Sequence, residues 1–178
     1  ARWQLESGWA SESNSSDEQS MPTDATLLQL EPKATAAEML VAMAFSTDHD
    51  RGRDTRSIGV DRVTVTEAGD QAWAEVLRLE PTSEGERRER PVLGMLDASV
   101  GLAHLGDSPK GVVMVQVAAS EDRGDSWSEL VPLEESGKVF GHIRPVWSAK
   151  GQLSWARLNG TVEICTASDV LPDPSAAT

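Results

Sequence analysis

The chain has 178 residues, of which 39% are hydrophobic and 25% charged, and its formal net charge is -13 at pH 7. This length is enough for one domain with its own core. An acidic surface repels phosphate groups, which argues against nucleic acid and anionic membranes as partners, and no stretch is apolar over the length of a membrane span. We therefore expect a soluble or peripheral protein.

Residues 1–31 are expected to form an acidic arm, because residues 7–20 are mostly Ser, Glu, Asp and Gln and have little to bury. Trp3 and Trp9 stand out in this segment. We expect them to bind a neighbouring protein surface, since aromatic side chains supply a large contact area at low entropic cost. The alternative is a disordered tail. The chain begins with Ala1 and not Met, from which we expect processing from a longer precursor.

A packed α-helix is predicted near residues 36–45. Thr35 and Glu38 stand three residues apart, as in a capping box. The following residues, 39–45, are apolar on every side of such a helix, which predicts burial between two apolar surfaces.

Strands and turns are expected to alternate over the rest of the domain, which we place at residues 32–170. Residues 60–66 and 72–79 flank a turn at 67–70 and predict a β-hairpin. Residues 91–105 contain short apolar pieces separated by glycines. An apolar, β-branched run at 112–117 predicts a buried strand.

The octapeptide 120–127 follows that strand and reads Ser-Glu-Asp-Arg-Gly-Asp-Ser-Trp. Asp122 and Gly124 are typical turn residues, one bonding nearby backbone N–H groups and the other tolerating positive φ. The octapeptide resembles the Asp-box of sialidase-type repeats, Ser-x-Asp-x-Gly-x-Thr-Trp, with Ser126 in place of Thr. The resemblance implies a structural hairpin in which Ser120, Asp122, Gly124 and Trp127 stabilise the turn. It covers these eight residues and no more.

A sialidase is not expected, for two reasons. The sequence contains one copy of the motif, whereas a propeller needs several blades with periodic motifs. It also contains no Tyr, the nucleophile of retaining sialidases.

The same loop contains Arg123-Gly124-Asp125, the adhesion sequence of integrin ligands. This resemblance implies a second possible role, in which Arg123 and Asp125 at an exposed loop tip bind an integrin-like receptor. A glycan is the other ligand that we consider for this loop.

The last predicted hairpin joins residues 153–158 to 161–166 through Asn159-Gly160, a strong signal for a two-residue turn. Such a turn pairs Trp155 with Ile164 and places Val162 on the same face. Residues 171–178 are expected to form a tail outside the fold.

Both asparagines, Asn14 and Asn159, also lie in glycosylation sequons. A sequon is used only if the chain enters a secretory pathway, which the sequence does not establish.

Catalytic constellations are not found in the sequence. The three histidines are scattered, and Cys165, the single cysteine, lies in a predicted strand. Asp48, Asp50 and Asp54 resemble a calcium loop weakly, but arginines interrupt them and the usual final Glu is missing. We therefore expect no enzyme activity, no metal and no cofactor.

The sequence thus predicts a mostly β protein with an antiparallel sandwich or jelly-roll-like core of hairpins, one helix and extended termini. The function that we expect is a structural or accessory subunit of a larger assembly, such as a capsid-type shell or an extrinsic subunit, with other protein subunits as partners. The alternatives are a carbohydrate- or receptor-binding module and, last, an enzyme of unfamiliar type.

Overall fold

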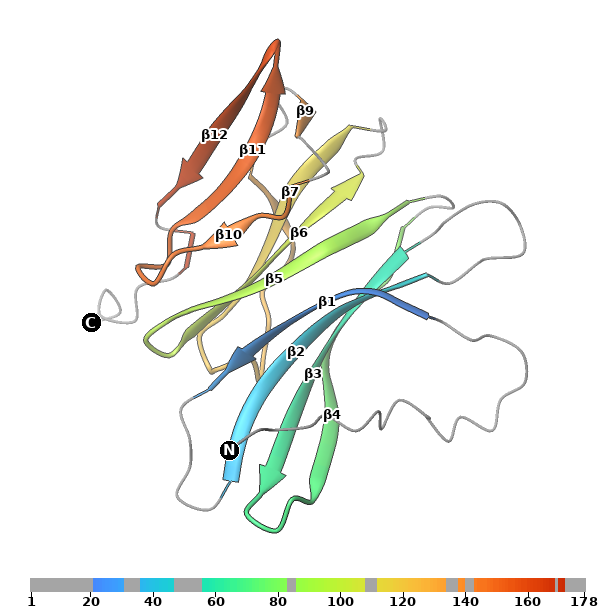
Figure 1. The fold of residues 1–178 in the computed structure, drawn as a ribbon, viewed down its shortest axis with the longest axis vertical. Helices are drawn as coiled ribbons and strands as arrows, with labels where there is room; N and C mark the ends of the chain where they lie inside the picture. The colour runs from blue at the N-terminus through green and yellow to red at the C-terminus, as the bar shows by residue number, and fades with distance from the viewer. Residues whose placement is uncertain are drawn as a thin grey trace.

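The computed structural model describes residues 21–30, 36–46, 56–82, 86–107, 112–133, 138–139, 143–168 and 170–171. Within these ranges the chain forms twelve β-strands and no helix (Figure 1). The expected mostly β class is confirmed. Trp3 and Trp9 lie outside the described residues.

Sheet A consists of four antiparallel strands in the order β1-β2-β3-β4. Their bounds are Met21–Gln29 for β1, Ala36–Ser46 for β2, Arg56–Thr66 for β3 and Gln71–Leu79 for β4. Each strand therefore pairs with the strand that follows it in the sequence.

Sheet B repeats this pattern in the order β5-β6-β7-β8, again antiparallel. Its strands are Arg88–Leu96 for β5, Ser99–Asp107 for β6, Val113–Ser120 for β7 and Val131–Pro132 for β8. Strand β5 also packs across β1, β2 and β3, so that it connects sheet B to sheet A (Figure 1).

Sheet C is built on the hairpin of β11 (Leu153–Asn159) and β12 (Thr161–Ala167). Two short strands, β9 (Lys138–Val139) and β10 (Val146–Trp147), pair with β11 on its other side. Sheet C lies beside sheet B, where β10 contacts β5 and β9 contacts β7 (Figure 1).

Sheet B is the middle layer, because its two faces belong to two different apolar clusters. Leu93, Val100 and Leu102 join the cluster that contains Leu40 and other residues of sheet A. The opposite face supplies residues to the cluster that contains Leu153 and Trp155 of sheet C, namely Val92, Ala103, Leu105, Val115 and Val117. Every residue of β6 from Ser99 to Gly106 is buried as a result.

The helix predicted near 36–45 is wrong, because these residues form β2. Strand β2 lies inside sheet A, between β1 and β3, and both of its faces are buried. Leu40 and Ala42 face sheet B, whereas Val41 and Met43 belong to a separate cluster with Val63 of β3. A strand that is buried on both faces gives the same unbroken apolar run as a buried helix, so periodicity cannot separate them. Thr35 lies outside the described residues.

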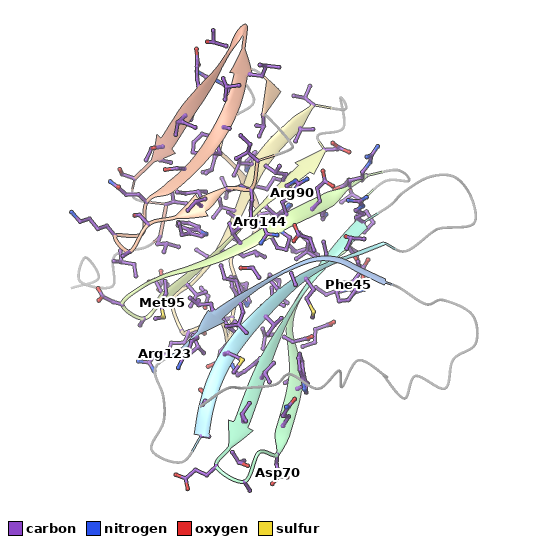
Figure 2. The ribbon with its side chains drawn as sticks, viewed as in Figure 1. Phe45, Asp70, Arg90, Met95, Arg123 and Arg144 are labelled. Atoms are coloured by element: carbon purple, nitrogen blue, oxygen red, sulfur yellow. The ribbon has the colours of Figure 1, made fainter. Side chains whose placement is uncertain are left out.

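The arm predicted for residues 1–31 includes β1, which is part of sheet A. Leu28 packs against the core, and Leu30 is buried. Arg144 fixes the outer edge of this strand by donating to the Ala25 carbonyl at 3.2 Å and pairing with the Asp24 carboxylate (Figure 2). The predicted arm included this strand because the residues that precede it are mostly polar and acidic.

The hairpin predicted from residues 60–66 and 72–79 is confirmed as β3 and β4. Its turn lies at the far end of sheet A, where Figure 2 labels Asp70. Gly69 has a φ of 90°, and the Asp70 backbone N–H donates to the Thr66 hydroxyl at 3.1 Å. Glycine tolerates this positive φ, as the turn requires.

The last hairpin is also present, but its predicted register is wrong by one residue. Trp155 pairs with Cys165, not with Ile164, and Gly160 lies at the tip with a φ of 73°. This register places Cys165 beside Trp155 on the face that packs against sheet B, and it moves Ile164 to the outer face. A slip of one residue exchanges the faces of the whole strand.

Trp147 of β10 attaches sheet C to sheet B at a pair of glycines. Gly94 and Gly101 are cross-strand partners in β5 and β6. A Cβ atom on Gly94 would lie 2.2 Å from Cγ of Trp147, and one on Gly101 would lie 2.6 Å from Cζ2. The indole therefore lies directly on the backbone of both strands, and its Nε1 donates to the Val92 carbonyl at 3.3 Å.

Leu171 extends the buried region into the segment that the sequence assigned to a tail. It is 4% exposed, and its Cδ2 lies 2.6 Å from the position of a Cβ atom on Gly101. The domain therefore includes this residue, and residues 172–178 lie outside the described part of the chain.

Candidate functional site

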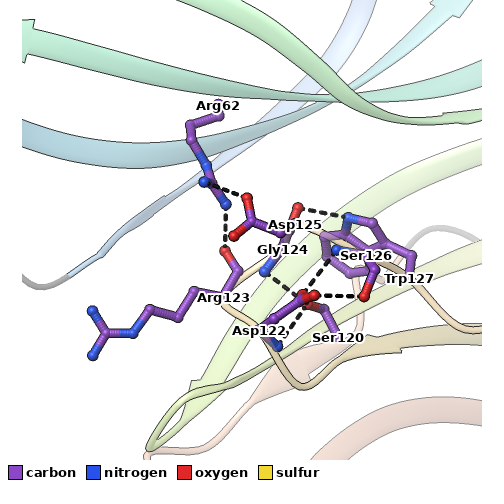
Figure 3. A network of polar contacts seen from close by, with 8 residues as sticks. All are labelled: Arg62, Ser120, Asp122, Arg123, Gly124, Asp125, Ser126 and Trp127. Carbon is purple, nitrogen blue, oxygen red and sulfur yellow. Dashed lines mark hydrogen bonds and ion pairs between the residues drawn. The ribbon is translucent and has the colours of Figure 1, made fainter.

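The loop after β7 carries the residues that the sequence singled out, and the structure brings them together (Figure 3). Ser120 is the last residue of β7, and residues 121–126 form bends and turns. The return strand β8 begins at Val131, and Trp127 lies in the segment before it. The Ser128 N–H still donates to the Ala119 carbonyl at 2.8 Å, which closes the base of the loop.

Ser120 and Asp122 hold this loop through side-chain hydrogen bonds (Figure 3). The Ser120 hydroxyl accepts from the Gly124 N–H at 2.7 Å and donates to Oδ1 of Asp122 at 2.8 Å. Asp122 in turn accepts from the Ser126 N–H at 2.8 Å and from the Ser126 hydroxyl at 2.6 Å. These bonds from Ser126, with that from Ser120, lower the pKa of Asp122 to about 2.

Gly124 and Trp127 complete the loop. Gly124 is buried with a φ of 91°, and a Cβ atom there would lie 2.8 Å from Cδ1 of Leu40 in β2. Glycine is thus required both for its conformation and for its close approach to sheet A. The indole Nε1 of Trp127 donates to the Gly124 carbonyl at 3.2 Å, and its ring packs against the core between sheets A and B.

Arg62 of β3 ties the tip of the loop to sheet A. Its guanidinium donates to Oδ1 of Asp125 at 2.6 Å and to the Arg123 carbonyl at 2.9 Å (Figure 3). The Asp125 side chain is 65% exposed. A receptor metal ion that binds this carboxylate through Oδ1 would compete with Arg62. Sequence reasoning missed Arg62, which is distant in the sequence and belongs to no motif.

Ser120→Ala is expected to lower the free energy of unfolding by about 1–3 kcal/mol, because the buried Gly124 N–H loses its acceptor. Asp122→Ala is expected to lower the Tm, since the Ser126 N–H and hydroxyl lose theirs. The folded-state pKa of Asp122 lies below the ordinary value of 3.8, so its contribution is present above that pH and is lost as the pH falls toward 2. Thermal melts at pH 7 check both variants.

Glu121→Ala serves as the control in the same loop. Because Glu121 is exposed, the Tm of this variant should match that of the wild type. If Asp122→Ala kept the wild-type Tm but abolished a binding activity, the structural role would be refuted.

The outer face of sheet C carries exposed apolar side chains. Leu158 and Val162 are cross-strand partners, 41% and 53% exposed, and the neighbouring Ile164 is 71% exposed. Val146 of β10 is the partner of Ser154 on this face and is 61% exposed. We call Val146, Leu158, Val162 and Ile164 the sheet C patch. Asn159 and Gly160, the predicted turn residues, lie at the tip of the same hairpin.

A buried polar cluster lies where β5 begins. Glu86 accepts from Arg88 at 2.8 Å, and both side chains are less than a tenth exposed. The second carboxylate oxygen of Glu86 accepts from the Thr82 N–H and hydroxyl. His104 of β6 is fully buried nearby; burial lowers its pKa to about 4, and the Arg88 charge acts in the same direction.

Known proteins offer no guide to what these sites do. The chain matches no protein-family model, no curated protein and no solved structure. Within the described ranges, no three His, Cys, Asp or Glu residues lie together as a metal ion requires. Those ranges also contain no helix long and apolar enough to cross a membrane. Asp48, Asp50 and Asp54 lie outside them.

Proposed function

We propose that this chain is a structural or accessory subunit of a larger protein assembly, of the capsid-shell or extrinsic-subunit type, without enzymatic activity. In this proposal, sheets A, B and C form a sandwich or jelly-roll-like body, and the outer surface of sheet C contacts other subunits.

The sheet C patch is the observation that carries the proposal. Leu158, Val162 and Ile164 are adjacent on two paired strands, and each is between 41% and 71% exposed. Single exposed apolar side chains are ordinary on a protein surface, but adjacent ones mark a surface that another protein covers. Val146 extends the patch along β10.

The alternative, a carbohydrate- or receptor-binding module that uses the loop at 120–127, has less support. Of the two side chains that an adhesion receptor would contact, the Asp125 carboxylate already accepts a hydrogen bond from Arg62 through Oδ1, and Arg62 also holds the Arg123 carbonyl. These contacts attach the loop to sheet A, which supports a structural role for it.

Native size measurement tests the assembly. The wild-type chain, expressed with a tag in its own host, is expected to elute from size exclusion in a complex well above its 19.1 kDa mass. Leu158→Lys combined with Val162→Lys should shift the chain to smaller species, because the charges cannot be desolvated in an interface. Val131→Lys, at an exposed apolar residue of β8, is the matched control and should leave the complex intact. Elution of the wild-type chain at 19.1 kDa would contradict the proposal.

A further inference from the structure

We propose that the free edge of β12 pairs with β12 of a second copy of this chain, so that sheet C continues antiparallel through a two-fold dimer. This inference rests on the proposed assembly function, and it identifies a second copy of the chain as one partner within that assembly. It is carried by the contrast between β12 and the outer strands of sheets A and B, and by the self-complementarity of this strand.

The outer strands of sheet A carry features that block pairing with another strand. Strand β1 contains Pro22 and a register shift beside it, and Arg144 bonds its edge at Asp24 and Ala25. The pairing of β4 with β3 is also interrupted by a register shift, after Val60. Prolines, bulges and charges of this kind are how natural sheets prevent edge-to-edge association.

Sheet B is protected in the same way at both edges. Strand β5 contains Pro91 within a register shift and packs across sheet A. Strand β8 has two residues, one of which is Pro132. A short strand offers few hydrogen bonds to a partner, and proline removes a donor.

Strand β12 has none of these protections. It is the last strand of sheet C, and within the described part of the chain no strand pairs with its other edge. Its seven residues, Thr161–Ala167, pair with β11 in unbroken register and include no Pro, Gly, Lys or Arg. Its one charge, Glu163, is neutralised by Arg157 of β11 at 2.8 Å. A regular edge whose one charge is paired within its own sheet is a template for strand addition.

The occupant is a second copy because β12 is complementary to itself. An antiparallel pair that uses all seven residues is centred on Ile164, which then lies opposite Ile164 of the other copy. Val162 lies opposite Thr166, and Glu163 lies opposite Cys165. No like charges meet, and Ile164 of one copy forms an apolar cross-strand contact with Ile164 of the other. A two-fold interface of this kind closes at a dimer.

The net charge of the chain predicts how the stability of the dimer depends on salt. Each copy carries a formal net charge of -13, so two copies repel one another at low ionic strength. Salt screens this repulsion and should tighten the dimer, whereas it would weaken the binding of a basic partner protein.

The test uses the purified chain in sedimentation equilibrium over a concentration series at low and high salt. The wild type should reach twice its 19.1 kDa mass, at lower concentration in high salt. Ile164→Lys should weaken the dimer by about tenfold or more, because two lysines would then face each other. Ile164 is 71% exposed, so this variant should fold with the wild-type Tm. Val131→Lys should dimerise like the wild type.

A cross-link checks the register. Ile164→Cys in a Cys165→Ala background leaves one thiol, opposite its own copy across the two-fold axis. Opposed residues in antiparallel strands lie about 4.5–5.5 Å apart between Cα atoms, within the range that a disulfide spans. Mild oxidation should therefore give a covalent dimer on a non-reducing denaturing gel, whereas Val131→Cys in the same background should give no covalent dimer on that gel.

The outcomes separate this inference from the function on which it rests. A purified wild-type chain that stays monomeric at every concentration and salt overturns the dimer, as does a dimer that Ile164→Lys leaves intact. If the chain is monomeric when purified but still elutes in a large complex from its host, the dimer fails and the assembly function stands. If both experiments give a monomer, both proposals fail.

Discussion

Trp147→Ala is expected to lower the free energy of unfolding by about 3 kcal/mol, at the lower end of the cost of removing a large aromatic side chain from a packed site. The indole covers Gly94 and Gly101 and joins sheet C to sheet B, so its loss leaves two glycine backbones open to water. Gly94→Ala is expected to cost about 1–3 kcal/mol for the opposite reason, because its methyl group meets the indole. Urea denaturation measures both changes.

The double variant is the control for this prediction. If the clash with Trp147 causes the loss at position 94, then Gly94→Ala should cost little in a Trp147→Ala background, since the space is vacant. Equal costs of Gly94→Ala in both backgrounds would show that the indole does not lie on this glycine.

Acidification from pH 6.5 to pH 4 is expected to remove about 3 kcal/mol of stability through His104 alone. The pKa of this buried imidazole is about 4 in the folded state, below its ordinary value of 6.5. Between these pH values the unfolded chain binds a proton that the folded chain does not, so stability falls as the pH falls. Below pH 4 both states are protonated and the loss is complete.

His104→Leu should reduce this loss, because leucine does not titrate. The comparison of wild type and variant at pH 7 and pH 4.5 isolates the histidine from the carboxylates, which titrate in both proteins. An NMR titration of the imidazole provides the direct measurement, and a midpoint near 6.5 would contradict the buried, neutral state.

Local turn chemistry in the sequence was enough to predict two hairpins, but the register predicted for the second was wrong. The turn at residues 67–70 gives the β3–β4 hairpin as expected. Asn159-Gly160 also marks a real turn, but the register is one residue away, because Trp155 and Cys165 pack together against sheet B. Tertiary burial of one face thus outweighs the preference of the turn.

The all-apolar run at residues 39–45 could not be assigned correctly from its pattern. It forms β2, whose two faces meet different surroundings, and only the layered arrangement of the sheets reveals this. A helix and a doubly buried strand demand the same residues, and a chance Thr-x-x-Glu spacing favoured the helix.

The loop at 120–127 was predictable in part, because its stabilising bonds are local. Ser120, Asp122 and Ser126 lie within six residues of one another, so their spacing alone indicates the turn. Arg62 and Leu40 contact the loop from sheet A and carry no local signal. The sheet C patch was missed for a similar reason, since the predicted register had placed Val162 and Ile164 on the same face as Trp155.

The order of strands in sheets A and B has a consequence for how the chain folds. Because each strand pairs with its sequence neighbour, either sheet can grow by successive hairpins, and each closure costs little chain entropy. The contacts that join distant parts of the sequence are those between sheets, where β5 crosses sheet A and Trp147 meets β5 and β6. We therefore expect the docking of preformed sheets to limit the folding rate, with the rate-determining contacts at these two junctions.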